Sequence, residues 1–389
     1  MLKNKLNIAI FQTLSGNFSE RGILIILFVL IPAILFISSC DTCTGIDKPG
    51  INPEDEVFFT ASPTNSDLPN IYRTNFQGSA IENIILNGMA FSSPSINGKI
   101  AFIRKSPIDG KNNLYVSKLD GSDAKLITSD NDIFNVSYPI LSPDGKYVAF
   151  NGGNSSLIYY DNSASTSMFN QMTGRLTLGC QPRFSNDSKY LAFFEGDGTS
   201  IPVTLKVIDA KSADEVKVIY SKILGNVKFS DNNEIAVNWS ANSKSLIYSI
   251  QKGINDDIHI INIENSSERI ISVPNSEIGG RQPAISPKED FLAVAGNDGN
   301  IWLIFIATND LRFSNITKSE GFERNYQPKW SSEGTKILYS SSSQFDTEFY
   351  STLVCSELQF EVALARAVKT YIISSNVFKG FWNYRTDNL

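Results

Sequence analysis

Short runs of four to six positions that are rich in hydrophobic, aromatic and β-branched residues recur along most of this chain. Val57–Thr60, Ile71–Thr74 and Lys146–Phe150 are clear examples. Runs of this length and composition, bounded by turn residues, predict β-strands. Asp, Asn, Ser, Gly and Pro gather between the runs and predict tight turns. The pattern therefore predicts an all-β fold.

One unit of this pattern recurs. Its clearest copy is Pro139–Phe150, with the sequence Pro-Ile-Leu-Ser-Pro-Asp-Gly-Lys-Tyr-Val-Ala-Phe. Related copies begin at Pro182, Val237, Pro283 and Pro328, and a shortened copy begins at Pro94. A fixed period of about 45 residues indicates a repeat architecture in which each unit is one supersecondary element.

The unit predicts a β-hairpin. In Ser142-Pro143-Asp144-Gly145, Pro presets φ at the second turn position and Gly tolerates a positive φ at the fourth. Lys146–Phe150 then supplies the second strand. Three copies lack the Gly, so we expect strained turns, or turns of another type, at Ser188, Ser243 and Glu289.

Two more short strands follow each hairpin. Four antiparallel strands per unit of about 45 residues is the period of a β-propeller blade. The predicted third strands are Leu114–Val116, Leu157–Tyr160, Leu205–Ile208, Ile258–Ile261 and Ile301–Ile304. The predicted fourth strands are Lys125–Thr128, Val216–Ile219 and Arg269–Ser272.

The Ser-Pro-Asp-Gly-Lys hairpins resemble the TolB-like propeller repeats of bacterial envelope proteins, which are distantly similar to WD40 repeats. The resemblance covers residues 57 to about 345. It implies a propeller fold and a place in the cell envelope. It implies no particular function, because the motif consists mostly of turn and core residues.

The repeat spacing predicts seven blades, with six as the alternative. The stretch before the first hairpin lacks an opening strand, which Val377–Trp382 can supply. The N-terminal and C-terminal strands would then share one blade, and closure would remove an exposed sheet edge. With six blades, the residues after about 345 would form an appendage. Residues Glu357–Lys369 lack an Asp-Gly turn and have helical propensity, so we expect an irregular strand or a short helix there.

The first forty residues have the features of an export signal. Basic residues precede the apolar run Ile23–Ile37, and Ser38-Ser39-Cys40 follows it. This ending resembles the bacterial lipobox, which implies cleavage before Cys40 and attachment of lipid to that residue. The alternative is an uncleaved anchor, although the run is short for a membrane span. We therefore predict a lipoprotein signal peptide at 1–39, a flexible tether at 40–56 and a propeller domain at 57–389.

Composition excludes several function classes. A net charge of −6 argues against nucleic-acid binding, which needs a basic face. No Gly-x-Ser-x-Gly motif is present, and the one histidine, His259, lies within a predicted strand.

No metal-ligand spacing appears, and Asp130–Asp132 lacks the rest of a calcium loop. Cys180 and Cys355 are expected to be buried free thiols. We predict no catalytic set, no metal site and no cofactor.

The positions just before the repeat-opening residues are the candidate binding site. First strands of propeller blades line the central channel, so the segments leading into them converge on one mouth. Polar and aromatic side chains there suit recognition of a peptide or polar ligand, although they can instead satisfy backbone groups. These residues are Tyr138, Gln181, Arg281, Gln282, Asn325, Tyr326 and Gln327. Phe184, Trp239 and Trp330 recur at whole-repeat spacing and are expected in the core between blades rather than in a sugar site.

The function expected from these features is a non-catalytic scaffold that binds a protein or peptide. It would be a monomer held through Cys40 in the outer or inner membrane, facing the periplasm or the cell surface. The alternative is an envelope enzyme acting on glycans or peptides at the channel mouth.

Overall fold

The structure is a computed structural model of the chain. It describes residues 56–62, 68–128, 136–152, 157–161, 169–171, 180–196, 200–211, 217–229, 235–273, 278–319, 323–343 and 351–382. All of them belong to one compact unit, Ile51–Leu389. The predicted signal peptide, Cys40, nearly all of the tether and Asp130–Asp132 lie outside the described residues.

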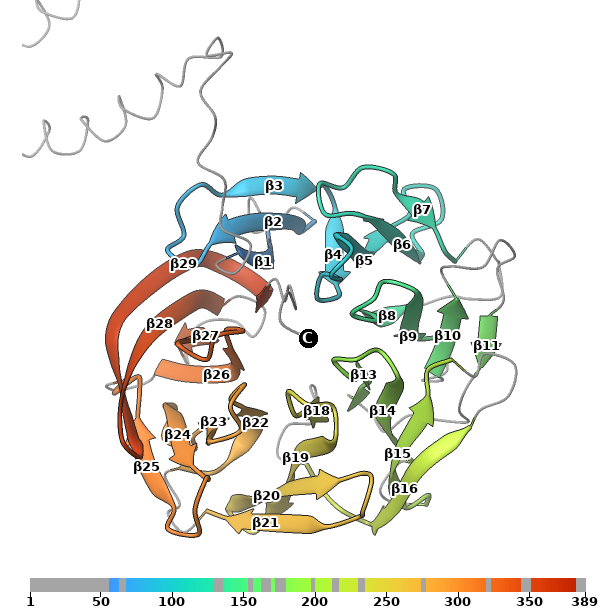
Figure 1. Cartoon of the computed structure of the whole chain (residues 1–389). Coiled ribbons are helices and arrows are strands. Elements are labelled where there is room, and N and C mark those ends of the chain that lie inside the picture. Colours follow the sequence, from blue (N-terminus) through green and yellow to red (C-terminus); the bar gives the residue numbers. More distant parts are fainter. Residues whose placement is uncertain are drawn as a thin grey trace, which may run out of the picture. The chain divides into compact units, whose positions relative to one another are not determined.

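Every described element is a β-strand, and the sheets form a propeller (Figure 1). Five sheets contain four antiparallel strands each. In chain order, the first sheet contains β4 (Gly88–Phe91), β5 (Lys99–Lys105), β6 (Asn112–Lys118) and β7 (Lys125–Leu126), and the second contains β8 (Ser137–Leu141), β9 (Tyr147–Asn151), β10 (Leu157–Asp161) and β11 (Phe169–Gln171). The third contains β13 (Arg183–Phe184), β14 (Tyr190–Glu195), β15 (Val203–Asp209) and β16 (Val218–Gly225), and the fourth contains β18 (Asn238–Trp239), β19 (Ser245–Lys252), β20 (Asn255–Asn262) and β21 (Glu268–Ser272). The fifth contains β22 (Arg281–Ile285), β23 (Phe291–Ala295), β24 (Ile301–Phe305) and β25 (Arg312–Asn315). The predicted all-β propeller of four-stranded antiparallel blades is confirmed.

A sixth sheet has seven strands and joins the two ends of the domain. Its order is β26 (Glu323–Trp330), β27 (Lys336–Ser343), β28 (Ser351–Glu361), β29 (Leu364–Trp382), β1 (Glu56–Ala61), β2 (Asn70–Asn75) and β3 (Glu82–Ile85). The C-terminal part of β29 pairs with β1 from Val57↔Trp382 to Ala61↔Val377. The predicted shared sheet of N-terminal and C-terminal strands is therefore present.

The preferred count of seven separate blades was wrong. The described residues form six blades, the alternative count. The reason is the length of β29: this single strand of 19 residues pairs first with β28 and then with β1. The strands expected in a seventh blade thus join the sixth sheet, and residues after 345 are part of the ring rather than an appendage.

The helix considered for Glu357–Lys369 is absent. This segment forms the end of β28, a tight turn and the start of β29, paired from Glu357↔Lys369 to Glu361↔Leu364. Ala365 also donates its backbone N–H to the Ser314 hydroxyl of β25 at 3.0 Å. Pairing on one side and this contact with the neighbouring blade override the helical propensity of the isolated segment.

The recurring Ser of each hairpin holds its turn together. Ser142 is fully buried; its hydroxyl donates to the Asp144 carboxylate at 2.6 Å and accepts from the backbone N–H of Tyr147 at 2.9 Å. Ser185 makes the same two contacts with Asp187 and Tyr190. The repeated motif is therefore explained by turn geometry.

The predicted strain at the turns without Gly is confirmed. Gly145 has φ = +69°, and Ser188, Ser243 and Glu289 take φ of +60°, +59° and +57°. These copies keep the same turn with a side chain in the left-handed region, which is costly for residues other than Gly.

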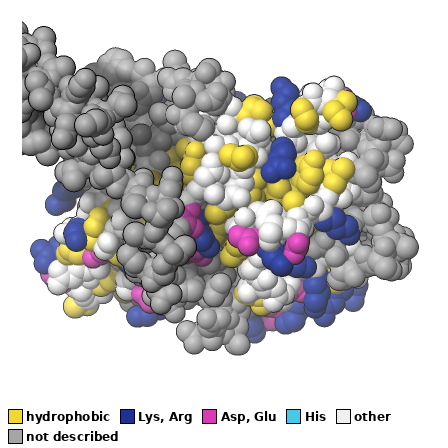
Figure 2. Space-filling view, turned by 90° about the horizontal axis from the view of Figure 1, so that it is seen from above, with side chains coloured by type: hydrophobic (Ala, Val, Ile, Leu, Met, Phe, Trp, Pro, Cys, Tyr) yellow, Lys and Arg dark blue, Asp and Glu magenta, His cyan; other side chains and the backbone are white. Residues whose placement is uncertain are grey.

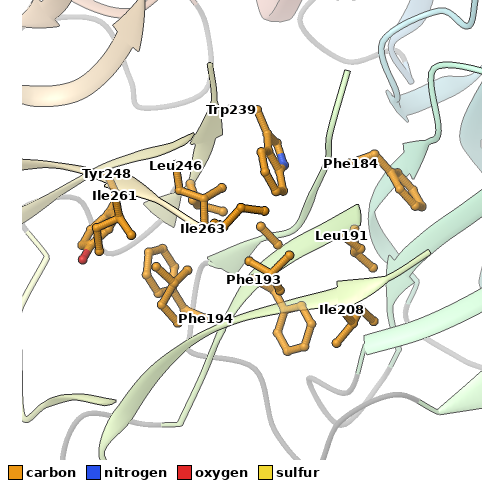
Figure 3. Close-up of a cluster of buried hydrophobic side chains, with 14 of the residues drawn as sticks. Phe184, Leu191, Phe193, Phe194, Ile208, Trp239, Leu246, Tyr248, Ile261 and Ile263 are labelled. Carbon is orange, nitrogen blue, oxygen red and sulfur yellow. The ribbon is translucent and has the colours of Figure 1, made fainter. Parts of the chain in front are cut away.

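The aromatic residues at repeat spacing belong to the core, as predicted. Phe184 and Trp239 lie in one buried cluster that spans the β8–β11, β13–β16 and β18–β21 blades and includes Phe193, Phe194 and Tyr248 (Figure 3). The indole N–H of Trp239 donates to the Arg183 carbonyl at 3.0 Å, which ties its innermost strand to that of the preceding blade. Trp330 makes the equivalent bond to Ala284. Cys355 is a buried free thiol.

The two ends of the ring differ in what they present. Strands β4, β8, β13, β18, β22 and β26 are innermost in their blades (Figure 1). We call the end where these strands begin the mouth face, and the end that carries turns such as Ser142–Gly145 the turn face. Because the strands in a blade are antiparallel, the connection from its second to its third strand also lies on the mouth face.

Candidate functional site

A backbone bulge marks the mouth face in three blades. Tyr138, Gln282 and Gln327 have φ of +49°, +51° and +55°, and each directly precedes a Pro. The innermost strands β8, β22 and β26 shift register at these residues. A residue before Pro normally takes an extended conformation, so a left-handed one is strained, and such strain concentrates at functional sites.

Part of the predicted polar rim serves the structure itself. The Gln282 side-chain oxygen accepts the backbone N–H of Gln327 at 2.7 Å, which joins the bulges of two neighbouring blades. Asn325 is buried, and its amide donates to the Gly299 carbonyl at 2.8 Å and the Ser319 hydroxyl at 2.7 Å. The side chains of Gln282 and Asn325 therefore satisfy polar groups of the fold near the strand starts, which is the alternative to ligand recognition considered for the predicted rim.

Gln181 lies differently from the other predicted residues. It is buried at the end of β12 (Cys180–Gln181), which pairs in parallel with β17 (Ile235–Ala236) of the next repeat. Its side-chain oxygen accepts from the Arg183 guanidinium at 2.7 Å. Gln181 therefore belongs to a junction between two innermost strands.

Arg281, Tyr138, Tyr326 and Gln327 are half-buried on the mouth face. One guanidinium nitrogen of Arg281 donates to the Gly296 carbonyl at 2.8 Å, which places Arg281 beside the β23–β24 connection. Tyr326 packs against the core between the last two blades. The structure thus brings the predicted residues to one end of the ring, with Arg281 and Gln327 as its partly accessible polar side chains.

Sequence reasoning missed a set of exposed aliphatic side chains on the same face. Leu68, Ile108, Ile201 and Ile254 each lie in the connection after the second strand of a blade or after β1, and they are 40%, 95%, 49% and 75% exposed. We call them the aliphatic rim. The Asn297 amide donates to the Ile254 carbonyl at 2.8 Å, so neighbouring connections touch.

Apolar residues are exposed elsewhere too. Figure 2 shows the domain turned by 90° from Figure 1 and seen from above, and hydrophobic side chains lie among Lys and Arg side chains on this surface. Ile81, Leu86 and Leu126 are 47%, 64% and 39% exposed on or beside the outer strands β3 and β7. The aliphatic rim differs from these because its members recur at corresponding connections.

Two further observations bear on chemistry. His259 of β20 stacks on Tyr248 at 5.0 Å, and its Nδ1 lies 2.7 Å from the Glu268 carboxylate. Within the described part of the chain, no group of three His, Cys, Asp or Glu side chains is placed to hold a metal ion. The same residues contain no helix with the length and apolar character to cross a membrane.

Comparison with known proteins identifies the fold alone. No protein-family model matches the chain, and no curated protein matches it. A solved structure from work on two prolyl endopeptidases is 16% identical over 76% of this chain and 45% of that chain, with a TM-score of 0.53. TolB from Acinetobacter baumannii is 16% identical over 78% of this chain and 77% of that chain, with a TM-score of 0.44. The putative TolB from Agrobacterium tumefaciens is 16% identical over 66% and 87%, also with a TM-score of 0.44.

Proposed function

We propose that this chain is a lipid-anchored propeller of the bacterial cell envelope that binds a protein or peptide on its mouth face and catalyses no reaction. The observation that carries the proposal is the aliphatic rim. Four exposed aliphatic side chains lie at corresponding connections on the mouth face, where Arg281 and Gln327 present polar groups. Exposed apolar side chains gathered on one face are a feature of protein-binding surfaces.

The strained bulges support the same face. A left-handed residue directly before Pro occurs in three innermost strands and costs stability there. The turn face has left-handed residues too, at Ser188, Ser243 and Glu289, but none of these precedes Pro. The bulges fix the innermost strands where a bound segment would lie. A rigid site loses less entropy on binding.

The cellular location follows from the N-terminal sequence. Lipid on Cys40 would hold the domain at the outer or inner membrane, with residues 41–55 as a tether. Several acyl chains on one residue give stable anchoring, whereas one chain does not. The domain would face the periplasm or the cell surface as a monomer.

The test is partner capture by the full chain, using chemical cross-linking in the cell envelope. Arg281→Ala combined with Gln327→Ala, and separately Ile108→Ser combined with Ile254→Ser, are expected to reduce the cross-linked product while the melting temperature stays nearly unchanged. Arg312→Ala combined with Gln77→Ala is the matched control, because it removes the same side-chain types from exposed positions away from the mouth face. Equal capture by all variants would move the site elsewhere.

The enzyme alternative has its own measurement. The purified full chain would be screened for hydrolysis of envelope glycans and peptides. Activity that disappears in the Arg281→Ala and Gln327→Ala variant would replace the scaffold proposal with a catalytic site at the channel mouth.

A further inference from the structure

The strands of the β28–β29 hairpin continue beyond the point at which the third strand ends in four other blades. In four blades, the residue directly after the third strand donates its backbone N–H to the hairpin turn of the same blade: Leu119 to Gly98, Ala210 to Lys189, Ile263 to Lys244 and Ile306 to Asp290. Leu358 makes the equivalent bond to Thr335. Here, however, β28 continues for three more residues to Glu361, which lengthens the hairpin by about 10 Å.

The end of this hairpin is apolar and exposed. Val362 is 100% exposed, and Leu364 and Phe360 are 45% and 38% exposed; we call these three residues the hairpin tip. Val362 also takes φ = +52°, which is a genuine outlier for a β-branched residue. A fully exposed Val in a turn position that suits Gly contributes little to folding.

The end of the hairpin packs against the neighbouring blade. The Phe360 ring lies 5.2 Å from that of Phe291 in the neighbouring blade. Ala363 and Ala365 are buried, and the Ala365 N–H bonds to Ser314. Arg366 lies 3.8 Å from Glu361, so the two charges next to the tip compensate each other. The tip is therefore fixed in position and exposes apolar side chains.

The first strand of the domain begins on the same side. Glu56, the first residue of β1, pairs with Asn75, where the β2–β3 turn begins. Both this turn and the β28–β29 turn connect the third and fourth strands of the blade pattern, so they lie on the same side. The β2–β3 turn also packs closely on β29, because a Cβ atom added to Gly78 would lie only 2.9 Å from the Ile373 Cα. The chain therefore enters β1 on the turn side of the ring, and the 16 residues from Cys40 to residue 55 can span at most about 55 Å.

We propose that the hairpin tip inserts into the lipid surface to which Cys40 anchors the chain. The inference rests on the lipid anchor of the proposed function. The apolar tip and the start of the tether share one side of the ring, whereas the aliphatic rim lies on the mouth face. Insertion of fixed apolar side chains at the headgroup boundary is favourable. It would orient the domain with its mouth face away from the membrane.

The experiment measures how deeply each side of the domain lies in lipid. The full lipidated chain is reconstituted in phosphatidylcholine–phosphatidylethanolamine vesicles, with or without brominated phosphatidylcholine, which quenches nearby tryptophan. Val362→Trp adds an indole at the hairpin tip. Ile254→Trp is the matched control, an exposed Ile on the mouth face. We expect the added emission of Val362→Trp to fall at least about two-fold more than that of Ile254→Trp.

The outcomes separate the two proposals. A chain that does not float with the vesicles overturns both the anchor and the insertion. A chain that floats with unquenched Val362→Trp emission overturns the insertion and leaves the anchor standing. Stronger quenching of Ile254→Trp reverses the orientation and overturns the inference. A wild-type dimer that Val362→Asp converts to a monomer would assign the tip to a second copy of the chain instead of lipid.

Discussion

The Ser188 hydroxyl accepts a hydrogen bond of 2.9 Å from the backbone N–H of Asp144, which lies 44 residues earlier in the preceding blade. Ser243 does the same for Asp187 at 3.1 Å. Both Ser residues occupy the left-handed turn position that Gly holds in other copies. The hydroxyl thus links adjacent turns, which Gly cannot do, and this bond offsets the cost of the strained backbone.

Substitutions at Ser188 should separate these two effects. Ser188→Ala keeps the strain and loses the bond, so we expect it to lower the free energy of unfolding by about 1–2 kcal/mol. Ser188→Gly loses the bond but relieves the strain, and it should cost roughly 1 kcal/mol less than the Ala variant. Urea titrations of the two variants would measure the difference.

Gly98→Ala is the control for backbone strain alone. Gly98 has φ = +68°, and a Cβ there meets nothing within 4 Å. Its expected cost is about 1 kcal/mol. A Ser188→Ala variant as stable as wild type would show that the link between the turns contributes nothing.

Closure of the ring by β29 gives the second prediction. Deleting residues 376–389 removes the pairing of β29 with β1, from Ala61↔Val377 to Val57↔Trp382. The edge of β1 then loses its partner strand, and the buried Val57 and Phe59 beside it lose packing. Calorimetry should show a lower melting temperature for the whole domain. A truncated domain that melts like the full chain would show that closure is unimportant for stability.

The repeat made the ring predictable from sequence. Pro139–Phe150 and its copies combine turn-forming residues with strand-forming residues, and both are local properties that can be recognised in the amino-acid sequence. The pairing of Val377–Trp382 with the first strand was predictable because the first blade lacked an opening strand. The aromatic core positions followed from their spacing by whole repeats.

The blade count and the β28–β29 hairpin depended on tertiary contacts. Ala363–Val368 contains good helix formers, and only its pairing with β28 and the contact with Ser314 make it a strand. The continuity of β29 through Val377 merges two predicted blades, and no local signal marks that continuity.

The candidate site was predictable in position but not in detail. Residues before the innermost strands do converge on the mouth face. Whether a polar side chain is used within the fold depends on the bulges and rotamers, which bind Gln282 to Gln327 and Asn325 to Gly299. The aliphatic rim was missed because single apolar residues in turns carry no periodic signal.

Lipidation of Cys40 is the third prediction. Cys40→Ala should abolish metabolic labelling of the chain with a fatty acid, because the thiol that carries the lipid is gone. Cys43→Ala is the matched control, since it removes a cysteine three residues away and should leave labelling unchanged. Labelling that persists in Cys40→Ala would exclude this residue as the anchor.

The fourth prediction concerns acid stability at the contact between the β13–β16 and β18–β21 blades. The Glu268 carboxylate accepts hydrogen bonds from Lys222 at 2.7 Å and lies 2.7 Å from the His259 Nδ1. Partial burial raises the pKa of Glu268, but the contacts with Lys222 and His259 outweigh burial and hold that pKa below its ordinary value of 4.5. The ionised carboxylate therefore favours the folded state.

The sign of the pH dependence follows from this lowered pKa. The stabilisation is fully present above the unfolded-state pKa of Glu268 and is lost as pH falls through the lower folded-state pKa. At neutral pH, Glu268→Gln should lower the free energy of unfolding by about 1 kcal/mol, and the gap to wild type should shrink as the pH falls below about 4. Glu264→Gln is the control, because its pair with Lys244 is well exposed and should change stability little. A Glu268→Gln gap that stays constant from neutral to acid pH would show that the carboxylate charge does not stabilise this contact between blades.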